Sequence, residues 1–143
     1  MGSKADTGHA VQEAARLDDA LLKLLLTKLN RPHISRRTEQ SIYSFGKRIR
    51  MAHARGLIDE ATHDDLKTIN AVRTVFAHAE RPVRFTSAPV RIEARKFAAY
   101  KPGASTRRLF DEAVARAEAA IDARRGALEY EHAKRPPKVS AKQ

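Results

Sequence analysis

Two residue types that together can handle a phosphate occur in one short segment, Arg73-Thr74-Val75-Phe76-Ala77-His78. An arginine can hold a phosphate, or the charge that develops on it in a transition state, with its forked guanidinium. A histidine titrates near neutral pH and can move the proton of a ribose 2′-hydroxyl. Arg73 and His78 are therefore candidate catalytic residues of a metal-independent ribonuclease.

The spacing of this pair limits what it can do within one helix. Five residues of an ideal helix turn through about 500°, so the two side chains point about 140° apart. They could reach one phosphate if the helix loosened at Ala77 and His78, or if a second subunit completed the site. A structural interpretation stays open, in which Arg73 flanks the apolar stripe and bonds a neighbouring carbonyl while His78 caps the helix end.

Other signals for catalysis or metal binding are weak. The chain has no cysteine, which excludes thiolate catalysis, disulfides and Cys-based zinc sites. Of its six histidines, His53, His63 and His78 are not spaced as an H-x-x-x-H pair, and no HExxH is present. The sequence predicts no metal site and no cofactor.

Positive charge is concentrated in two stretches of the chain. The 143 residues include 28 basic and 17 acidic ones, a net charge of +11. Residues 31–56 hold seven basic residues and one acid, and residues 73–108 hold nine basic residues and two acids. The charge favours an anionic partner, either nucleic acid or an acidic protein, although a solvated basic surface is the plainer alternative. The candidate nucleic-acid-binding residues are Arg36, Arg37, Lys47, Arg48, Arg50, Lys134, Arg135 and Lys138.

The elements that must position these residues are helices. Apolar residues recur every three or four positions, which indicates an all-α fold, a small bundle of four main helices plus one short helix. The expected ranges are 9–30, 41–55, 59–79, 90–99 (the short helix) and 107–131. Gly56 is the expected C-terminal cap of the second helix and Asp59 the N-terminal cap of the third. Residues 82–90 are expected to form an extended loop over the edge of the core.

The same sequence patterns predict the domain organisation. Residues 1–131 are expected to form one domain with residues 1–8 frayed, and residues 132–143 a disordered basic tail. No apolar run approaches the length that crosses a bilayer, so we expect no membrane contact and a cytoplasmic location. The turn at Gly56 could form part of a helix-turn-helix, but Asp59, Glu60, Asp64 and Asp65 would repel phosphate where a recognition helix meets DNA.

A longer pattern resembles a known family. It comprises residues 44–52, Gly56-Leu57-Ile58, Asp65-Leu66, residues 69–73 and Phe76-Ala77-His78, and it resembles the mannitol operon repressor (MtlR/MltR) family. The resemblance covers about residues 10–120 and implies an all-helical transcriptional repressor or regulator without a standard DNA-reading motif. Asn70 departs from the pattern, which has Arg at that position.

The Arg-x4-His segment also resembles the motif of HEPN domains. The resemblance implies a helical bundle that often works as a dimeric ribonuclease, with Arg73 and His78 as the catalytic pair. Thr74 departs from both families, which commonly have Asn or another larger polar residue there.

Three hypotheses follow for the function. The first is a cytoplasmic regulator that binds nucleic acid or a protein partner without catalysis. The second is a metal-independent ribonuclease that uses Arg73 and His78. The third is a non-catalytic dimeric interaction module, which an apolar patch on the first helix would support, and a homodimer is expected.

Overall fold

The fold is an all-helical bundle, as the apolar periodicity predicts. A computed structural model describes residues 2–29 and 44–134 of the chain. These residues form five helices, α1 (Gly2–Lys28), α3 (Phe45–Ala54), α4 (Glu60–His78), α5 (Ala88–Ala94) and α6 (Thr106–Lys134). Residues 30–43 and most of the expected tail, residues 135–143, lie outside the described residues.

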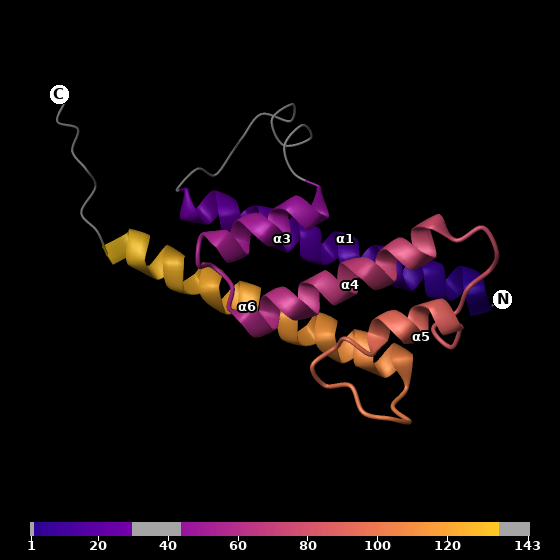
Figure 1. The fold of residues 1–143 in the computed structure, drawn as a ribbon. Helices are drawn as coiled ribbons and strands as arrows, with labels where there is room; N and C mark the ends of the chain where they lie inside the picture. Colours follow the sequence, from indigo (N-terminus) through magenta and orange to yellow (C-terminus); the bar gives the residue numbers. More distant parts are fainter. Residues whose placement is uncertain (1, 30–43, 135–143) are drawn as a thin grey trace.

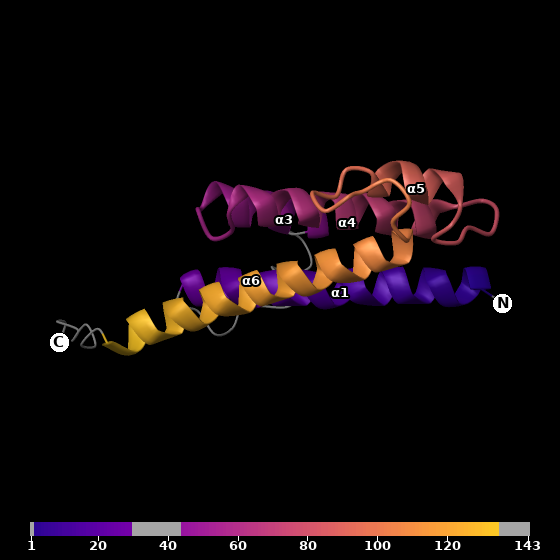
Figure 2. The same cartoon turned by 90° about the horizontal axis from the view of Figure 1, so that it is seen from below.

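The helices form two layers (Figures 1 and 2). Helices α1 and α6 lie side by side in one layer, and α3, α4 and α5 lie in the other. Helices α1 and α6 run in the same direction. Two side-chain hydrogen bonds, His9 with Asp111 and Arg16 with Glu118, join them at the same offset of 102 residues, as only parallel helices allow. Helix α4 runs in the opposite direction and packs against both (Figure 1). The C-terminal turns of α6 extend past the other layer (Figure 2).

The core lies between the two layers. Its fully buried side chains include Leu17, Leu21 and Leu24 of α1, Ile69 of α4 and Phe110 of α6. The connection between α4 and α5 adds Phe85, whose ring lies 4.9 Å from that of Phe76 and 5.3 Å from that of Phe110. The predicted loop is therefore confirmed for residues 82–87, whereas residues 88–90 belong to α5.

The structure corrects several helix ends. Helix α1 begins at Gly2, so the prediction that residues 2–8 are frayed was wrong. Asp6 accepts a hydrogen bond from the backbone N–H of Phe85 at 3.0 Å, and such a tertiary contact leaves no mark on local periodicity. The short helix is Ala88–Ala94 instead of residues 90–99, and α6 continues to Lys134 instead of ending at residue 131.

The caps between α3 and α4 follow the prediction. Gly56 adopts a left-handed backbone conformation with φ of +71°, which suits glycine. Asp59 accepts a hydrogen bond from the backbone N–H of Thr62 at 2.8 Å, so it caps α4 as expected. This turn fixes the end of α3 against the start of α4.

Among residues 2–29 and 44–134, no helix is both long and apolar enough to cross a membrane.

Candidate functional site

Arg73 and His78 line one pocket between α1, α3 and α4. The pocket has a volume of about 380 Å³ and also includes Asp18 of α1 and Phe45 of α3. Its remaining walls are short or apolar side chains: Val11, Ala14, Ala15 and Ala77. Short side chains at facing positions leave room between helices, so the alanines of α1 and α4 create this space.

The two candidate catalytic residues share the pocket without any loosening of α4. The helix stays regular through His78, and Ala79 after it is extended. The loosening that would let both side chains reach one phosphate is therefore not present, although both residues line the same pocket. Arg73 is half-buried and His78 is exposed.

Neither side chain makes a hydrogen bond or an ion pair within the described part of the chain, although Arg73 is close enough to Asp18 to act on its charge. The expected carbonyl bond of Arg73 and helix cap by His78 are therefore not formed there. Thr74, in contrast, donates its hydroxyl proton to the carbonyl of Asn70 at 2.8 Å. The guanidinium and the imidazole therefore remain available to a ligand, while the hydroxyl between them is used by the helix.

Asp18 connects this pocket to a buried ion pair. Arg48 Nη1 lies 2.9 Å from Asp18 Oδ1, and the Arg48 side chain is only 9% exposed. Burial raises the pKa of Asp18, and the guanidinium groups of Arg48 and Arg73 oppose that rise. The Asp18 carboxyl, which lines the pocket, thus faces the positive charges of two arginines from different helices.

Arg48 is the residue whose predicted role the structure contradicts. It was expected among the phosphate-binding residues, but its guanidinium is buried and paired with Asp18. A charge held inside the fold in this way supports structure and does not offer a free contact to phosphate. Its partner is 30 residues away in sequence, and no local pattern reveals such a pair.

Three of the other expected nucleic-acid-binding residues lie in the described part of the chain, two on α3 and one at the end of α6. Lys47 and Arg50 are exposed on α3. Lys134 lies at the end of α6, where its ammonium is 5.2 Å from the centre of the Tyr130 ring. Arg36, Arg37, Arg135 and Lys138 lie outside the described residues.

A different set of basic residues occupies one end of the bundle. The segment from the last turns of α4 to the first turn of α6 forms the end at which α1 begins (Figure 1). Three of its nine basic residues have carboxylate partners, namely Lys96 with Glu93, Arg107 with Asp111 and Arg108 with Glu112. The other six make no ion pair with the described residues: Arg73, Arg81, Arg84, Arg91, Arg95 and Lys101.

Two of these arginines lie beside an exposed aromatic ring. Arg91 and Arg95 are one turn apart on and just after α5, and they line a pocket of about 190 Å³ together with Tyr100. Tyr100 is 37% exposed. Arginines beside an exposed ring are the combination that holds the phosphates and bases of single-stranded nucleic acid. The charge count of residues 73–108 is the sequence signal for this set. The binding residues predicted from the sequence lie instead in residues 31–56 and in the C-terminal tail.

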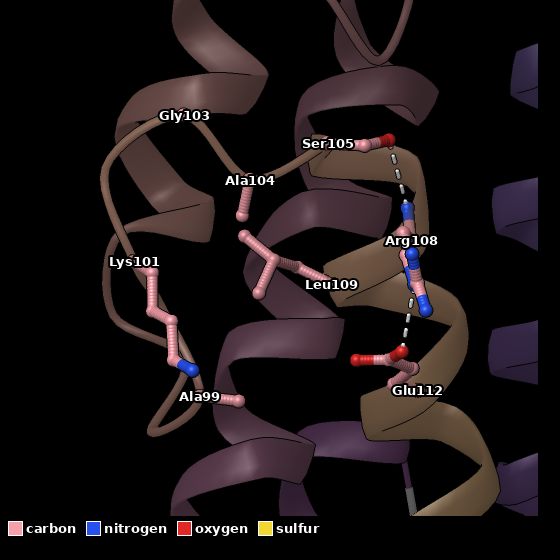
Figure 3. A pocket seen from close by; sticks show the side chains of 8 residues that line it. All are labelled: Ala99, Lys101, Gly103, Ala104, Ser105, Arg108, Leu109 and Glu112. Carbon is pink, nitrogen blue, oxygen red and sulfur yellow. Dashed lines mark hydrogen bonds and ion pairs between the residues drawn. The ribbon is translucent and has the colours of Figure 1, made fainter.

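A larger pocket lies next to the start of α6 (Figure 3). Its volume is about 470 Å³, and Ala99, Gly103, Ala104 and Leu109 form much of its wall. The polar groups at its rim are mostly engaged: Ser105 accepts from the backbone N–H of Arg108, and Arg108 pairs with Glu112. Lys101 adds to the basic end described above, but nothing in this pocket selects a ligand.

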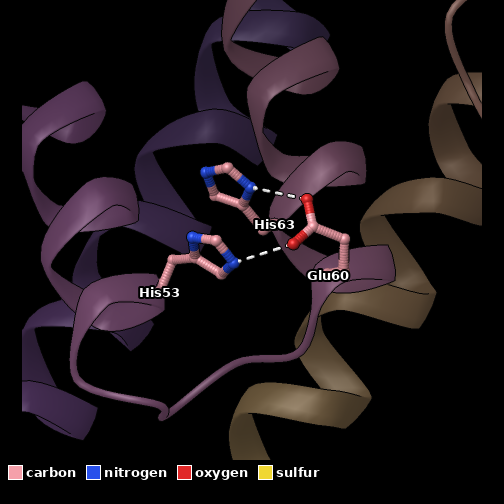
Figure 4. Close-up of side chains that lie close together, drawn as sticks. All are labelled: His53, Glu60 and His63. Carbon is pink, nitrogen blue, oxygen red and sulfur yellow. Dashed lines mark hydrogen bonds and ion pairs between the residues drawn. The ribbon is translucent and has the colours of Figure 1, made fainter.

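The structure also brings together three metal-ligating side chains, where the sequence predicted no metal site. Atoms of His53, Glu60 and His63 lie within 4.8 Å of one another (Figure 4). The search for H-x-x-x-H missed them because the two histidines come from different helices. One sequence signal could have found them. A Glu-x-x-His spacing begins the helix that follows a tight interhelical connection, and a histidine stands in the last helical turn before that connection.

Comparison of the chain with protein-family models, with curated proteins and with solved structures gives no match.

The first helix carries no broad apolar patch among its described residues. Its leucine stripe is mostly buried in the core, and its large exposed apolar side chain is Val11, followed by Leu29 just beyond its end. Ile92, Tyr100 and Tyr130 are exposed on other elements. The feature that would favour a dimeric interaction module through α1 is therefore missing from this part of the chain.

Proposed function

We propose that this protein is a regulator that binds nucleic acid through the basic end of its helical bundle. The observation that supports the proposal is the imbalance of charge there. Six of the nine basic side chains in residues 73–108 have no carboxylate partner in the described structure. If the arginines served only solubility, we would expect them to be interspersed with acids, as they are along α6.

The resemblance to the mannitol operon repressor family supports the regulatory part of this proposal. The start of α4, which would be the recognition helix of a helix-turn-helix at Gly56, carries Asp59, Glu60 and Asp64 on its exposed surface. These acids would repel phosphate, so we place the nucleic acid at the other end of α4. Contacts there go to the backbone and the bases of a flexible strand, with Tyr100 available for stacking.

Salt dependence of binding tests this proposal. We expect fluorescence anisotropy to show binding of labelled single-stranded RNA and duplex DNA that weakens steeply as salt rises. Arg91→Gln and Arg95→Gln should each reduce the slope of log K against log salt by about 1. Arg124→Gln is the matched control, because Arg124 is an exposed arginine of α6 outside the basic end.

Two results would overturn the proposal. One is the absence of binding to any nucleic acid at low salt, which would instead favour an acidic protein partner. The other is an equal effect of Arg124→Gln and Arg91→Gln, which would mean that net charge alone matters.

A second candidate function is metal-independent cleavage of RNA, which the shared pocket of Arg73 and His78 favours. Arg73 would hold the phosphate, and His78 would take the proton of the 2′-hydroxyl as its oxygen attacks phosphorus. The bond from phosphorus to the 5′-oxygen would break and that oxygen would take a proton from water, so the products would be a 2′,3′-cyclic phosphate and a 5′-hydroxyl. Thr74 weakens this candidate, because its short hydroxyl is bonded to the helix backbone.

Incubation of labelled RNA with the protein in EDTA tests cleavage. We expect His78→Gln and Arg73→Gln to abolish product, while His132→Gln, a histidine near the end of α6, leaves it unchanged. Equal cleavage by wild type and His78→Gln would reveal a contaminating nuclease, and no cleavage by wild type would end this candidate.

A further inference from the structure

The turn between α3 and α4 holds two imidazoles against one carboxylate. His53 lies in the last turn of α3, and Glu60 and His63 lie in the first turn of α4. The backbone between them is well anchored: the N–H of Leu57 donates to the carbonyl of Ala52 at 2.8 Å, and the side chains of Leu57 and Ile58 are buried. The positions of the three side chains are therefore set by a rigid turn.

The nitrogen atoms of both histidines face the same carboxylate (Figure 4). His53 Nε2 lies 3.1 Å from Glu60 Oε1, and His63 Nδ1 lies 3.7 Å from Glu60 Oε2. The two imidazole rings are stacked, with centroids 3.8 Å apart and planes 7° from parallel. Two nitrogens and a carboxylate oxygen thus converge on one small volume.

One atom of this cluster lacks a partner. His63 Nδ1 is shielded from solvent and makes no hydrogen bond, since 3.7 Å to Glu60 is too long for one. A shielded polar atom without a partner is costly, and native structures rarely contain one. Asp64 Oδ1 also lies 3.7 Å from this nitrogen, so a second carboxylate faces the same point. A cation bound at this point would satisfy the nitrogen and balance the two acids.

Two imidazoles and a carboxylate are the donors that late first-row divalent metals prefer. Zinc binds histidine nitrogen at about 2.0–2.1 Å and is tetrahedral, so two histidine ligands have nitrogens about 3.4 Å apart. In the structure the ligand atoms of the three side chains lie within 4.8 Å of one another, close to this spacing. The rings are nearly parallel, so one of them must turn out of the stack to aim its lone pair at a shared ion. The exposed fractions of His53 (35%) and Glu60 (72%) leave room for this turn.

We propose that His53, Glu60 and His63 form a binding site for a zinc-like divalent cation, which joins the end of α3 to the start of α4. The site uses three protein ligands and leaves a fourth position for water. It lies at the opposite end of α4 from Arg73 and His78, so it is separate from the nucleic-acid surface proposed above. Occupancy of the site would hold the α3–α4 turn more firmly.

Calorimetric titration with Zn²⁺, on the full chain without a histidine tag, tests the site. We expect one equivalent to bind to wild type. Glu60→Gln and His53→Gln should weaken binding at least as much as the roughly 10- to 100-fold loss typical of changes beyond the ligands themselves. Co²⁺ should give a visible absorption spectrum with wild type that His53→Gln abolishes.

The controls separate loss of a ligand from loss of the fold. Glu60 is highly exposed, so Glu60→Gln should keep the circular dichroism of wild type while it loses affinity. His132→Gln removes a histidine outside the cluster and should bind Zn²⁺ as wild type does. Absence of binding to wild type, or unchanged binding in both Glu60→Gln and His53→Gln, would overturn the proposal and leave the cluster as an ordinary ion-pair network.

Discussion

Replacement of Arg48 by methionine tests whether this residue is part of the structure or part of a binding surface. The Arg48 side chain is 9% exposed and pairs with Asp18 at 2.9 Å, while Asp18 keeps 29% of its side chain exposed. Arg48→Met keeps much of the aliphatic volume and removes the charge. It leaves Asp18 half-buried with one opposing arginine fewer.

The expected cost follows from that exposure. Removal of one partner from a fully buried ion pair costs about 3–5 kcal/mol, and the water that reaches Asp18 lowers this to about 2 kcal/mol of unfolding free energy at pH 7. The cost should depend on pH, because burial already raises the pKa of Asp18 and Arg48 opposes that rise. Without Arg48 the pKa rises further, so the native state holds its proton more strongly.

The sign of the pH effect is therefore fixed. A carboxyl whose pKa is raised on folding is most favourable to stability when protonated, and that advantage is lost as pH rises through the folded pKa. Arg48→Met increases this effect, so its deficit relative to wild type should be small near pH 4 and should grow toward pH 7.

Urea unfolding of wild type and variants at several pH values measures this deficit. Arg50→Met is the matched control, because Arg50 is exposed on the same helix, and it should change stability by less than about 0.5 kcal/mol. Adding Asp18→Asn to Arg48→Met should recover part of the loss, since no unpaired carboxylate remains. A cost for Arg48→Met that equals that of Arg50→Met, or that does not vary with pH, would refute the assignment of Arg48 to the core.

Three further substitutions test the packing and the turn. Phe110→Ala should lower the unfolding free energy by about 4 kcal/mol, because the ring is fully buried between the layers, and a loss below about 1 kcal/mol would contradict this core. Gly56→Ala should cost about 1 kcal/mol of unfolding free energy, because φ at this position is +71° and no atom would crowd the added carbon, so the strained backbone is the whole cost. Gly56→Asn should cost less, because asparagine adopts the left-handed conformation more readily. The N–H of Thr62 holds the pKa of Asp59 below its usual value, so Asp59→Ala should lower the melting temperature at pH 7. The loss should shrink progressively as pH falls below about 4 and through the lowered pKa, and a loss that does not shrink in acid would argue against the cap.

Sequence periodicity predicted most of the helical framework because it reflects burial directly. The apolar stripe of the third helix, Leu66, Ile69, Val72 and Phe76, is buried in α4 as expected. The cap at Asp59 was also predictable, since it depends on hydrogen bonds within one turn. Features of this kind involve residues that are close in sequence.

The features that the sequence did not predict depend on distant residues. The start of α1 at Gly2 depends on the contact between Asp6 and Phe85, which is 79 residues away. The buried pair of Arg48 and Asp18 and the cluster of His53, Glu60 and His63 both join different helices. A single sequence carries the residue types for such pairs but not the distances between them.

Ion pairs account for only part of the positive charge of the described residues. The half-buried Asp18 pairs with Arg48, and the buried Asp65, one of the acids at the start of the expected recognition helix, pairs with Arg116. Six basic residues of 73–101 make no ion pair with the described residues, and neither do exposed ones elsewhere such as Lys47, Arg50 and Arg124, so substitution of single residues must locate the binding surface.

Substitutions of Arg91 and His78 distinguish the two proposed functions. If the chain only binds nucleic acid, Arg91→Gln weakens binding and His78→Gln has little effect, because the proposed phosphate contacts come from the arginines. If it cleaves RNA, His78→Gln abolishes cleavage while binding of uncleavable DNA persists.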